Sequence, residues 1–286
     1  AESSPSSLAP CYNVSDVNNP GLTMGPVNSN CTAETKAKDG PCVSDLRGAT
    51  DASPEITKSQ PDVRILLAFG FYRYSDDLVN FTRSRDYATF LQTSDRAMGI
   101  TIDGIINMAS PSPLLSQYKD VPKDLLCSAL KPSTWNTVHR ECVHVVKVPA
   151  NKTVEIICVS IGTHRPDGIS HAIHLHGYDM SVIGMGVLNQ SLPFNQSVIQ
   201  LLQSITQDNK TQIPKDPVTK DVWSMPNGGY TIGRIYTDNP GFWYFHCHFA
   251  YHLDAGMSGV LQVGDEDTFP QPPPNFPTCG NYKPPL

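Results

Sequence analysis

The sequence predicts an all-β domain, built as a Greek-key β-sandwich. Three observations support this fold class. Many short segments are apolar or alternate between apolar and polar residues over strand length, and Gly, Pro and Asn separate them in turn-like clusters. The chain has 286 residues, of which 39% are hydrophobic, so it is long enough to bury a substantial core.

Composition divides the chain into three parts. Residues 1–60 are rich in Ser, Pro, Asn and Asp and show little hydrophobic periodicity, so we expect a long irregular interdomain linker with its own cysteines. Residues 61–264 hold the strand pattern. Residues 265–286 form a Pro-rich C-terminal tail, which we expect to be extended and to pack on a neighbour.

The strands of the sandwich can be placed in order along residues 61–264. Strands are predicted at 64–74, 98–108, 142–148, 153–161, 171–185, 222–223, 230–237, 241–248 and 259–263. Residues 78–91 are expected to be irregular or partly helical. Turns are predicted at 227–229 and 238–241. The pattern also predicts that 142–148 and 153–161 pair as an antiparallel hairpin about residues 149–151.

One short segment offers several metal ligands. His246, Cys247 and His248 are followed by His252 and Met257, and imidazole, thiolate and thioether together are the ligands of a blue-copper centre. Alternate side chains of a strand point to opposite faces. Cys247 should therefore serve one metal site while its two neighbours serve another.

A second cluster supplies further imidazoles. His171, His174 and His176 lie within six residues, and the last two share a face by the same alternation. Either motif alone has an ordinary interpretation, since a lone H-x-H can be structural, a lone Cys can be a nucleophile, and a lone Met is usually core. Zinc is disfavoured because the clusters hold one Cys and no C-x-x-C. The other histidines, His139, His144 and His164, are scattered and predicted to be surface or core residues.

These segments carry a family resemblance. The two histidine motifs, 171–177 and 246–257, resemble the copper signatures of the last, third cupredoxin domain of multicopper oxidases. Four further segments, 64–69, 111–118, 226–230 and 238–243, look like the invertebrate laccases, arthropod-type in particular. The resemblance covers most of residues 42–264 and implies a cupredoxin-like sandwich.

The resemblance implies a role for each ligand position. It assigns the type 1 copper to His171, Cys247, His252 and, as weak axial ligand, Met257; the type 2 copper to His174; and the type 3 pair to His176, His246 and His248. In the family, a substrate gives one electron at a time to the type 1 copper, the electron passes through the cysteine backbone to the flanking histidines, and four electrons reduce O2 to water.

The same resemblance implies a partner. The family's trinuclear cluster uses eight His, and this chain offers four of them, because its only H-x-H motifs are 174/176 and 246/248. The expectation is therefore a C-terminal part of a larger laccase-type oxidase of phenols and diphenols. N-terminal cupredoxin domains on another chain or fragment would supply the other histidines.

Two alternative functions remain open. A metal-ion oxidase such as a ferroxidase would need acidic residues beside the edge formed by His171 and His252, and Asp167, Asp179 and Asp254 are near in sequence. A non-enzymatic copper-binding glycoprotein would keep the scaffold without oxygen chemistry. Ala250 keeps that alternative open, because many relatives have a proton-transferring carboxylate in this part of the motif.

Charge and modification motifs indicate the setting. The net charge of −6 and pI near 5.8 disfavour nucleic acid or an anionic membrane as partner, and no apolar run reaches the roughly 18 residues of a membrane span. Seven N-x-S/T sequons together with eight cysteines predict a secreted, disulfide-bonded glycoprotein. The sequon asparagines are Asn13, Asn30, Asn80, Asn151, Asn189, Asn195 and Asn209.

The cysteines allow some pairings to be proposed. Cys127 and Cys142 bracket a loop that they could close, and Cys158 lies in an apolar strand and is expected to be buried and free. Without the copper thiolate seven cysteines remain, so at least one is free or pairs outside the chain. We expect Cys279, in the Pro-rich tail, to bond to the absent N-terminal domain, as the corresponding region does in some laccases.

Overall fold

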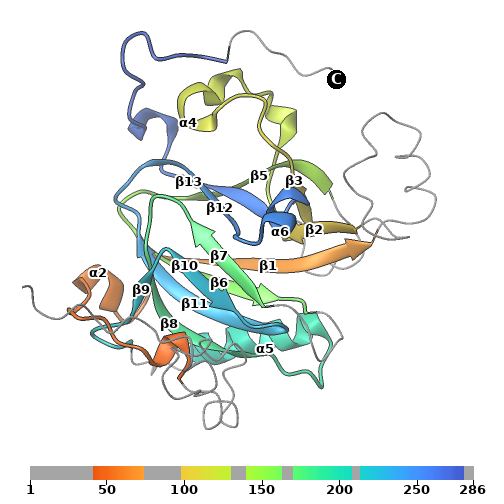
Figure 1. Ribbon diagram of the computed structural model, residues 1–286. Helices are drawn as coiled ribbons and strands as arrows, with labels where there is room; N and C mark the ends of the chain where they lie inside the picture. The colour runs from red at the N-terminus through yellow and green to blue at the C-terminus, as the bar shows by residue number, and fades with distance from the viewer. Residues whose placement is uncertain (1–40, 74–97, 130–139, 163–169, 208–212, 280–286) are drawn as a thin grey trace, which may run out of the picture.

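Strands dominate the part of the chain that the computed structural model describes, which is residues 41–73, 98–129, 140–162, 170–207 and 213–279 (Figure 1). The predicted all-β class is confirmed. The strands are β1 (Val63–Arg73), β2 (Met98–Ile102), β3 (Ile105–Asn107), β4 (Leu126–Cys127), β5 (Arg140–Val148), β6 (Thr153–Ser160), β7 (His171–Leu175), β8 (Met180–Val187), β9 (Thr219–Lys220), β10 (Val222–Met225), β11 (Gly229–Tyr236), β12 (Gly241–Cys247) and β13 (Ser258–Val263).

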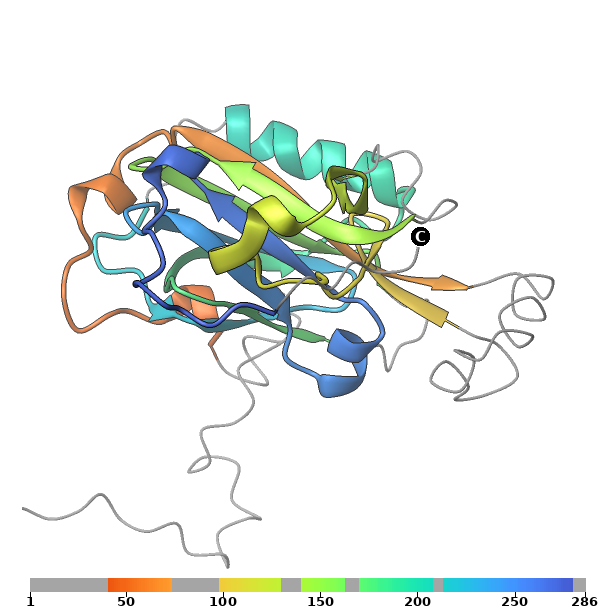
Figure 2. The same ribbon diagram turned by 90° about the horizontal axis from the view of Figure 1, so that it is seen from above.

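The strands form one continuous path that folds into two layers. Its order is β10-β7-β12-β13-β5-β3-β2-β1-β6-β11-β8-β9, and β4 pairs with β5 outside this path. The segment from β10 to β5 packs face to face on the segment from β3 to β9 (Figures 1 and 2). The main core, with Phe69, Ile173 and Trp223 among its members, lies between these layers.

The predicted hairpin between residues 142–148 and 153–161 is wrong. Both strands form, but β5 pairs with β13 and β3, whereas β6 lies between β1 and β11 in the other layer. The connection is held by Thr237, whose backbone and hydroxyl bond to residues 149, 151 and 152. All residues of β6 are buried, so a central position between two strands suits it better than a hairpin edge.

The helical segments are short, except for α5, and lie between strands or before the first and after the last of them. The helical segments are η2 (Val43–Asp45), α2 (Pro54–Thr57), α4 (Leu114–Gln117), η4 (Tyr118–Asp120), η5 (Lys123–Leu125), α5 (Phe194–Gln207), α6 (Ala250–Asp254) and η7 (Glu266–Thr268). None of the helices in the described ranges has the length and apolar character that a membrane crossing requires.

Helix α5 was not predicted from the sequence. Its apolar side chains, Phe194, Val198, Leu201, Leu202 and Ile205, follow the helical spacing of three and four residues. They pack on the outer face of the layer that contains β6 and β11, and Figure 2 shows the helix along that face. The periodicity signal was present, but a prediction built on strands alone overlooked it.

Two segments outside the predicted domain core can be partly described. Cys42 and Val43 are buried in the main core, and α2 is fixed by hydrogen bonds from Arg234 to the carbonyl groups of Ile56 and Lys58. Residues 41–60 therefore pack on the sandwich. At the other end, Phe269 is buried, and the tail continues from there as exposed, mostly irregular chain to residue 279. Residues 78–91 lie outside the described ranges.

A buried acid and a buried imidazole meet in the core. Strands β2 and β3 join at Asp103-Gly104, both with positive φ, and the Asp103 carboxylate accepts the backbone N–H of Ala68 at 2.7 Å. Its other oxygen lies 3.6 Å from Nε2 of His144, too far for a hydrogen bond. Burial raises the pKa of Asp103 to about 7 and lowers the pKa of His144 to about 4. His144 is thus a core residue, as the sequence predicted.

Single substitutions in this pair are expected to give pH slopes of opposite sign. In Asp103→Asn the unfolded state protonates His144 near pH 6.5 and the folded state only near 4, so the free energy of unfolding rises with pH across this interval. In His144→Gln the folded state keeps the Asp103 proton up to about pH 7 while the unfolded state loses it near 3.8, so stability falls as pH rises. Between pH 4 and 6.5, the free energy of unfolding of each variant should change by about 3 kcal/mol.

The unsubstituted chain is the control for these slopes. Between pH 4 and 6.5 one proton resides on the pair in both the folded and the unfolded state, so the pair itself adds almost no slope. Urea titrations at several pH values in this interval measure the free energy of unfolding of the parent and of both variants. Two variants whose slopes share one sign, after subtraction of the parent slope, would contradict the buried-pair interpretation.

Candidate metal centre

The pairing of β7 with β12 brings the two histidine motifs together. The strands run antiparallel, with His246 opposite His174 and Cys247 opposite Ile173. Alternation along β12 turns the Cys247 side chain into the core, where it is fully buried, and places His248 in solvent. The two-faced arrangement predicted from the sequence is therefore present.

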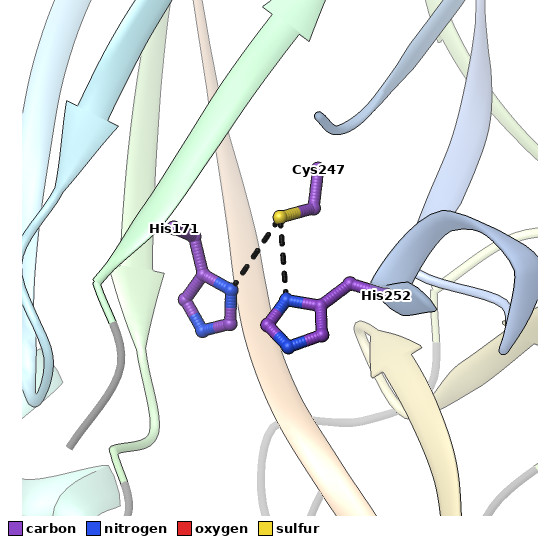
Figure 3. A group of neighbouring side chains, drawn as sticks. All are labelled: His171, Cys247 and His252. Atoms are coloured by element: carbon purple, nitrogen blue, oxygen red, sulfur yellow. Dashed lines mark hydrogen bonds between the residues drawn. The ribbon is translucent and has the colours of Figure 1, made fainter. Parts of the chain in front are cut away.

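Cys247 lies between two imidazoles on the core side. Its Sγ atom is 3.7 Å from Nδ1 of His171 and 3.4 Å from Nδ1 of His252, and all three side chains are buried (Figure 3). His171 comes from β7, Cys247 from the end of β12 and His252 from α6. These ligand atoms all lie within 4.8 Å of one another, which is close enough for one metal ion to contact all three.

The loop after Cys247 folds back on itself, so that His252 lies next to the cysteine. The carbonyl of His252 accepts the N–H of Met257 at 2.9 Å, and the carbonyl of Met257 accepts the N–H of Cys247 at 3.0 Å. Met257 is fully buried in the same core cluster as Cys247. The predicted axial methionine is thus anchored beside the cysteine through its backbone.

Burial sets the protonation of this group. It lowers the pKa of His171 to about 3, with a smaller effect from His252, and it also lowers the pKa of His252. Both rings are therefore neutral and offer a lone pair. Burial raises the pKa of the Cys247 thiol, opposed by backbone hydrogen bonds of Phe249 and Ala172. A metal ion would displace that proton and stabilise the thiolate.

A second group of imidazoles lies on the other face of β12. Ligand nitrogens of His174, His176 and His246 lie within 4.8 Å of one another, and Nε2 of His176 is 3.3 Å from Nε2 of His246. The ring of His248 lies 5.8 Å from that of His174 and 5.7 Å from that of His246. All four predicted imidazoles therefore belong to one cluster.

Backbone carbonyls orient two of these rings. Nδ1 of His174 lies 2.9 Å from the carbonyl oxygen of Asp221, and Nδ1 of His246 lies 2.9 Å from that of Cys247. A carbonyl can only accept, so each Nδ1 donates, and Nε2 is the ring nitrogen that is left to bind a metal. Burial and the neighbouring imidazoles lower the pKa of His176, and burial lowers that of His246. The lowered pKa values favour the neutral form of the His176 and His246 rings, which can bind a cation.

The chain turns sharply after His176, and a glycine is needed there. Gly177 has a φ of +73°, and a Cβ atom on it would lie 2.2 Å from the Trp243 ring. The indole of Trp243 donates to the carbonyl of Asn239 at 2.8 Å, and the Tyr178 hydroxyl donates to the same carbonyl. This turn fixes the end of β7 against β12 and with it the positions of the imidazoles.

The structure adds residues that the sequence did not indicate. Phe71 on β1 packs against both core imidazoles, with ring centroids 5.9 Å from His171 and 5.5 Å from His252. Its position in an apolar strand gave no signal. Of the acidic candidates, Asp179 lines the hollow beside His174 and His176, whereas Asp254 is exposed on α6. Asp167, His139 and His164 lie outside the described residues.

A two-layer β-sandwich with a buried Cys-His-His group and a separate imidazole cluster defines a cupredoxin-like metal-binding protein. A family model described as multicopper oxidase matches residues 108–267, more than half of the chain. The chain therefore belongs to the multicopper oxidase family.

The chain is also similar to curated relatives and to solved structures. Laccase-19 of Oryza sativa subsp. japonica is 33% identical over 176 residues, which make up 60% of this chain and 26% of that protein. The chain thus spans about a quarter of that relative's length. The laccase of Botrytis aclada matches with a TM-score of 0.45 and 19% identity, covering 84% of this chain and 34% of that one. Fet3p, described as a multicopper oxidase that functions in iron import, matches with a TM-score of 0.44 and 18% identity, covering 73% and 32%.

One detail of the predicted resemblance is corrected. The curated relatives are plant laccases, from rice and Arabidopsis thaliana, rather than the arthropod-type laccases that the motifs indicated. The arthropod-type prediction was based on the four segments 64–69, 111–118, 226–230 and 238–243, and segments of five to eight residues are too short to distinguish one subgroup of laccases from another. The laccase part of the prediction is supported.

Proposed function

We propose that this chain is the electron-entry part of a secreted, laccase-type multicopper oxidase. The observation that carries the proposal is the position of Cys247. Its side chain joins His171 and His252 on one face of β12, while the adjacent His246 joins the second imidazole cluster on the other. The two groups of candidate ligands are thus joined by one short stretch of backbone, which would give electrons a covalent path between metals bound there.

The donor atoms of the buried group fit copper. One thiol and two neutral imidazoles are the ligands of a blue-copper site, and Met257 is in place as the proposed axial ligand. Copper bound there supplies one-electron redox chemistry. Phe71 and the buried surroundings exclude water from the ligands, and the hydrogen bonds that close the loop 247–257 hold Cys247, His252 and Met257 close to one another.

The second cluster supplies half of an oxygen-reducing site in this proposal. His174 is assigned to the type 2 copper and His176, His246 and His248 to the type 3 pair. The cluster is partly open to solvent, with His176 and His248 exposed. Further cupredoxin domains of the same oxidase would cover this open side and contribute the remaining imidazoles for the four-electron reduction of O2 to water.

The surface beside His252 favours an aromatic reductant. Phe249 and Tyr251 are 48% and 45% exposed, and their rings lie 5.4 Å and 6.3 Å from that of His252. Such faces stack on phenols and diphenols. The ferroxidase alternative needs carboxylates at this edge. Asp179 lines the hollow at the other cluster instead, which leaves Asp254 as the described candidate from the sequence.

Turnover of two reductants tests the substrate class. The oxidase that contains this chain is supplied with catechol or with ferrous iron while oxygen consumption is followed. We expect kcat/KM for catechol to exceed that for ferrous iron, and Asp254→Asn to leave both unchanged. Preferential turnover of ferrous iron that is lost in Asp254→Asn would favour the ferroxidase.

Copper content tests whether the chain acts in an oxidase at all. Four coppers in material that carries additional H-x-H motifs would support the proposal. One copper, no partner and no oxygen consumption would favour the non-enzymatic copper-binding glycoprotein.

We propose that a disulfide through Cys279 joins this chain to its partner domains. The Cys279 thiol is free and exposed, and its backbone N–H is fixed by the side chain of Gln117 at 2.8 Å. Electrophoresis without reductant tests the bond, because migration of the chain by itself would exclude it. Two expectations about other cysteines are confirmed: Cys127 and Cys142 form a disulfide, and Cys158 is buried and free.

Secretion and N-glycosylation complete the proposal. Three sequon asparagines, Asn151, Asn189 and Asn195, are exposed, so glycans attached there would extend into solvent. The other four, Asn13, Asn30, Asn80 and Asn209, lie outside the described residues. A shift in mass after treatment with an N-glycosidase would support this assignment.

Replacement of Met257 is expected to raise the redox potential of the buried site. In Met257→Leu a weak axial thioether is exchanged for an aliphatic group of similar size, which should favour Cu(I) over Cu(II). Redox titration of the blue absorption band measures the change. An unchanged or lowered potential would show that the thioether is not an axial ligand.

A further inference from the structure

A cleft of about 1080 Å³ lies along the seam between β1 and β5, and no proposed metal ligand lines it. Its lining includes Ile65, Leu66 and Leu67 of β1 and Val145 and Val146 of β5. The segment from α4 to β4 closes the outer side. This volume is at the upper end of what small-molecule sites in proteins enclose.

The cleft exists because two strands lack a neighbour on this side. Strand β2 pairs with β1 only from Phe69 to Arg73, so residues 63–67 pair with β6 alone among the described strands. The end of β5 likewise pairs with β13 on one side. Ile65, Leu66 and Val146 consequently remain only half-buried, and aliphatic surface stays open to a ligand.

The rim of the cleft is cationic. Lys119, Lys123, Arg140 and Lys147 all line it, all are exposed, and none forms an ion pair within the described ranges. Glu266 is the one acidic residue at the rim. In a chain of net charge −6, such a concentration of positive charge at the mouth of a low-dielectric cleft attracts anions.

We propose that this cleft binds a small amphiphilic carboxylate, with its anionic group at the lysines and its apolar body along β1 and β5. Asp103 lines the same cleft and is itself 1% exposed. An anionic group would be repelled there once Asp103 ionises, so the carboxylate belongs at the rim. Lysine at a strand edge can also serve to prevent aggregation, and that role predicts no saturable binding.

The proposal is tested by isothermal titration calorimetry, in which decanoate is added to the 286-residue chain together with any domains that co-purify. We expect saturable binding at one site, and weaker binding of the uncharged 1-decanol. The double variant Lys119→Gln/Lys123→Gln should lower the affinity by about 10-fold, the effect of losing one charge-assisted contact. The matched variant Lys215→Gln/Lys220→Gln, at exposed lysines that do not line the cleft, should bind decanoate like the parent chain.

A second variant separates binding in the cleft from general attraction to lysine. Val146→Trp places an indole against the apolar lining of the cleft and should weaken decanoate binding while the rim lysines stay in place. Unfolding midpoints equal to that of the parent show that each variant is folded. Absence of saturable binding to the parent, or equal binding by the parent and the folded Val146→Trp chain, would overturn the proposal. Because no readout involves copper or turnover, failure here leaves the oxidase proposal untouched.

Discussion

Replacement of Cys247 by serine is expected to abolish the blue absorption band and nearly all turnover of the assembled oxidase. The substitution removes the one thiolate of the buried group, in which Sγ lies 3.4 Å and 3.7 Å from the two imidazole nitrogens. Loss of partners outside the ligand shell typically costs 10- to 100-fold, so loss of this ligand should cost more than about 100-fold in kcat. Absorption spectroscopy, copper analysis and oxygen consumption measure the three consequences.

Cys158 offers a matched control for this experiment. It is also free and fully buried, on β6, but it belongs to neither ligand group. Burial raises the pKa of its thiol to about 12, as expected of a core cysteine. Cys158→Ser should therefore retain the blue band and lose only stability. Retention of the blue band in Cys247→Ser, or its loss in Cys158→Ser, would refute the assignment of the thiolate.

The largest expected effect on stability comes from Glu155. Its carboxylate lies 2.6 Å from Nε of Arg64 and 2.9 Å from Nη2 of Arg234, and these three residues stand opposite one another on β1, β6 and β11. Glu155 and Arg234 are each 2% exposed. Glu155→Gln leaves the Arg234 guanidinium buried without a countercharge, which should lower the free energy of unfolding by about 3–5 kcal/mol.

An exposed ion pair provides the comparison. Lys215 and Asp51 approach to 3.2 Å, but their side chains are 76% and 66% exposed. Asp51→Asn should change stability little or not at all, because such pairs gain little in water. Urea denaturation of both variants measures the difference. A loss from Glu155→Gln as small as that from Asp51→Asn would mean that the carbonyl groups of Ile56 and Lys58, to which Arg234 already donates, are sufficient to stabilise its guanidinium.

Much of the metal centre could be predicted because ligand chemistry and strand alternation are local properties. A period of two along 246–248 is sufficient to separate Cys247 from its neighbours. The strand positions followed from the same local pattern, and β1, β11, β12 and β13 form close to where they were expected. Helix α5 was missed although its periodicity was equally local, because only strands were sought in that region.

Strand pairing was predicted less well, for a different reason. β5 and β6 adjoin in sequence and are separated by a short turn, which favours a hairpin on local grounds. Their actual partners lie far away in sequence, and burial of β6 in the centre of its layer decides the outcome. Such long-range packing leaves no local signal.

The sequence by itself predicted which side chains are candidate metal ligands and that they divide into two groups, because residue chemistry and the period of a strand are local properties. Only the tertiary structure decided which distant residues complete each group. It placed His171 of β7 against Cys247, 76 positions away, and set Phe71 of β1 over both imidazoles. The tertiary structure also formed the cleft between β1 and β5 and placed lysines from separate segments along it. These features depend on how the layers pack, and packing energy is a property of the whole fold.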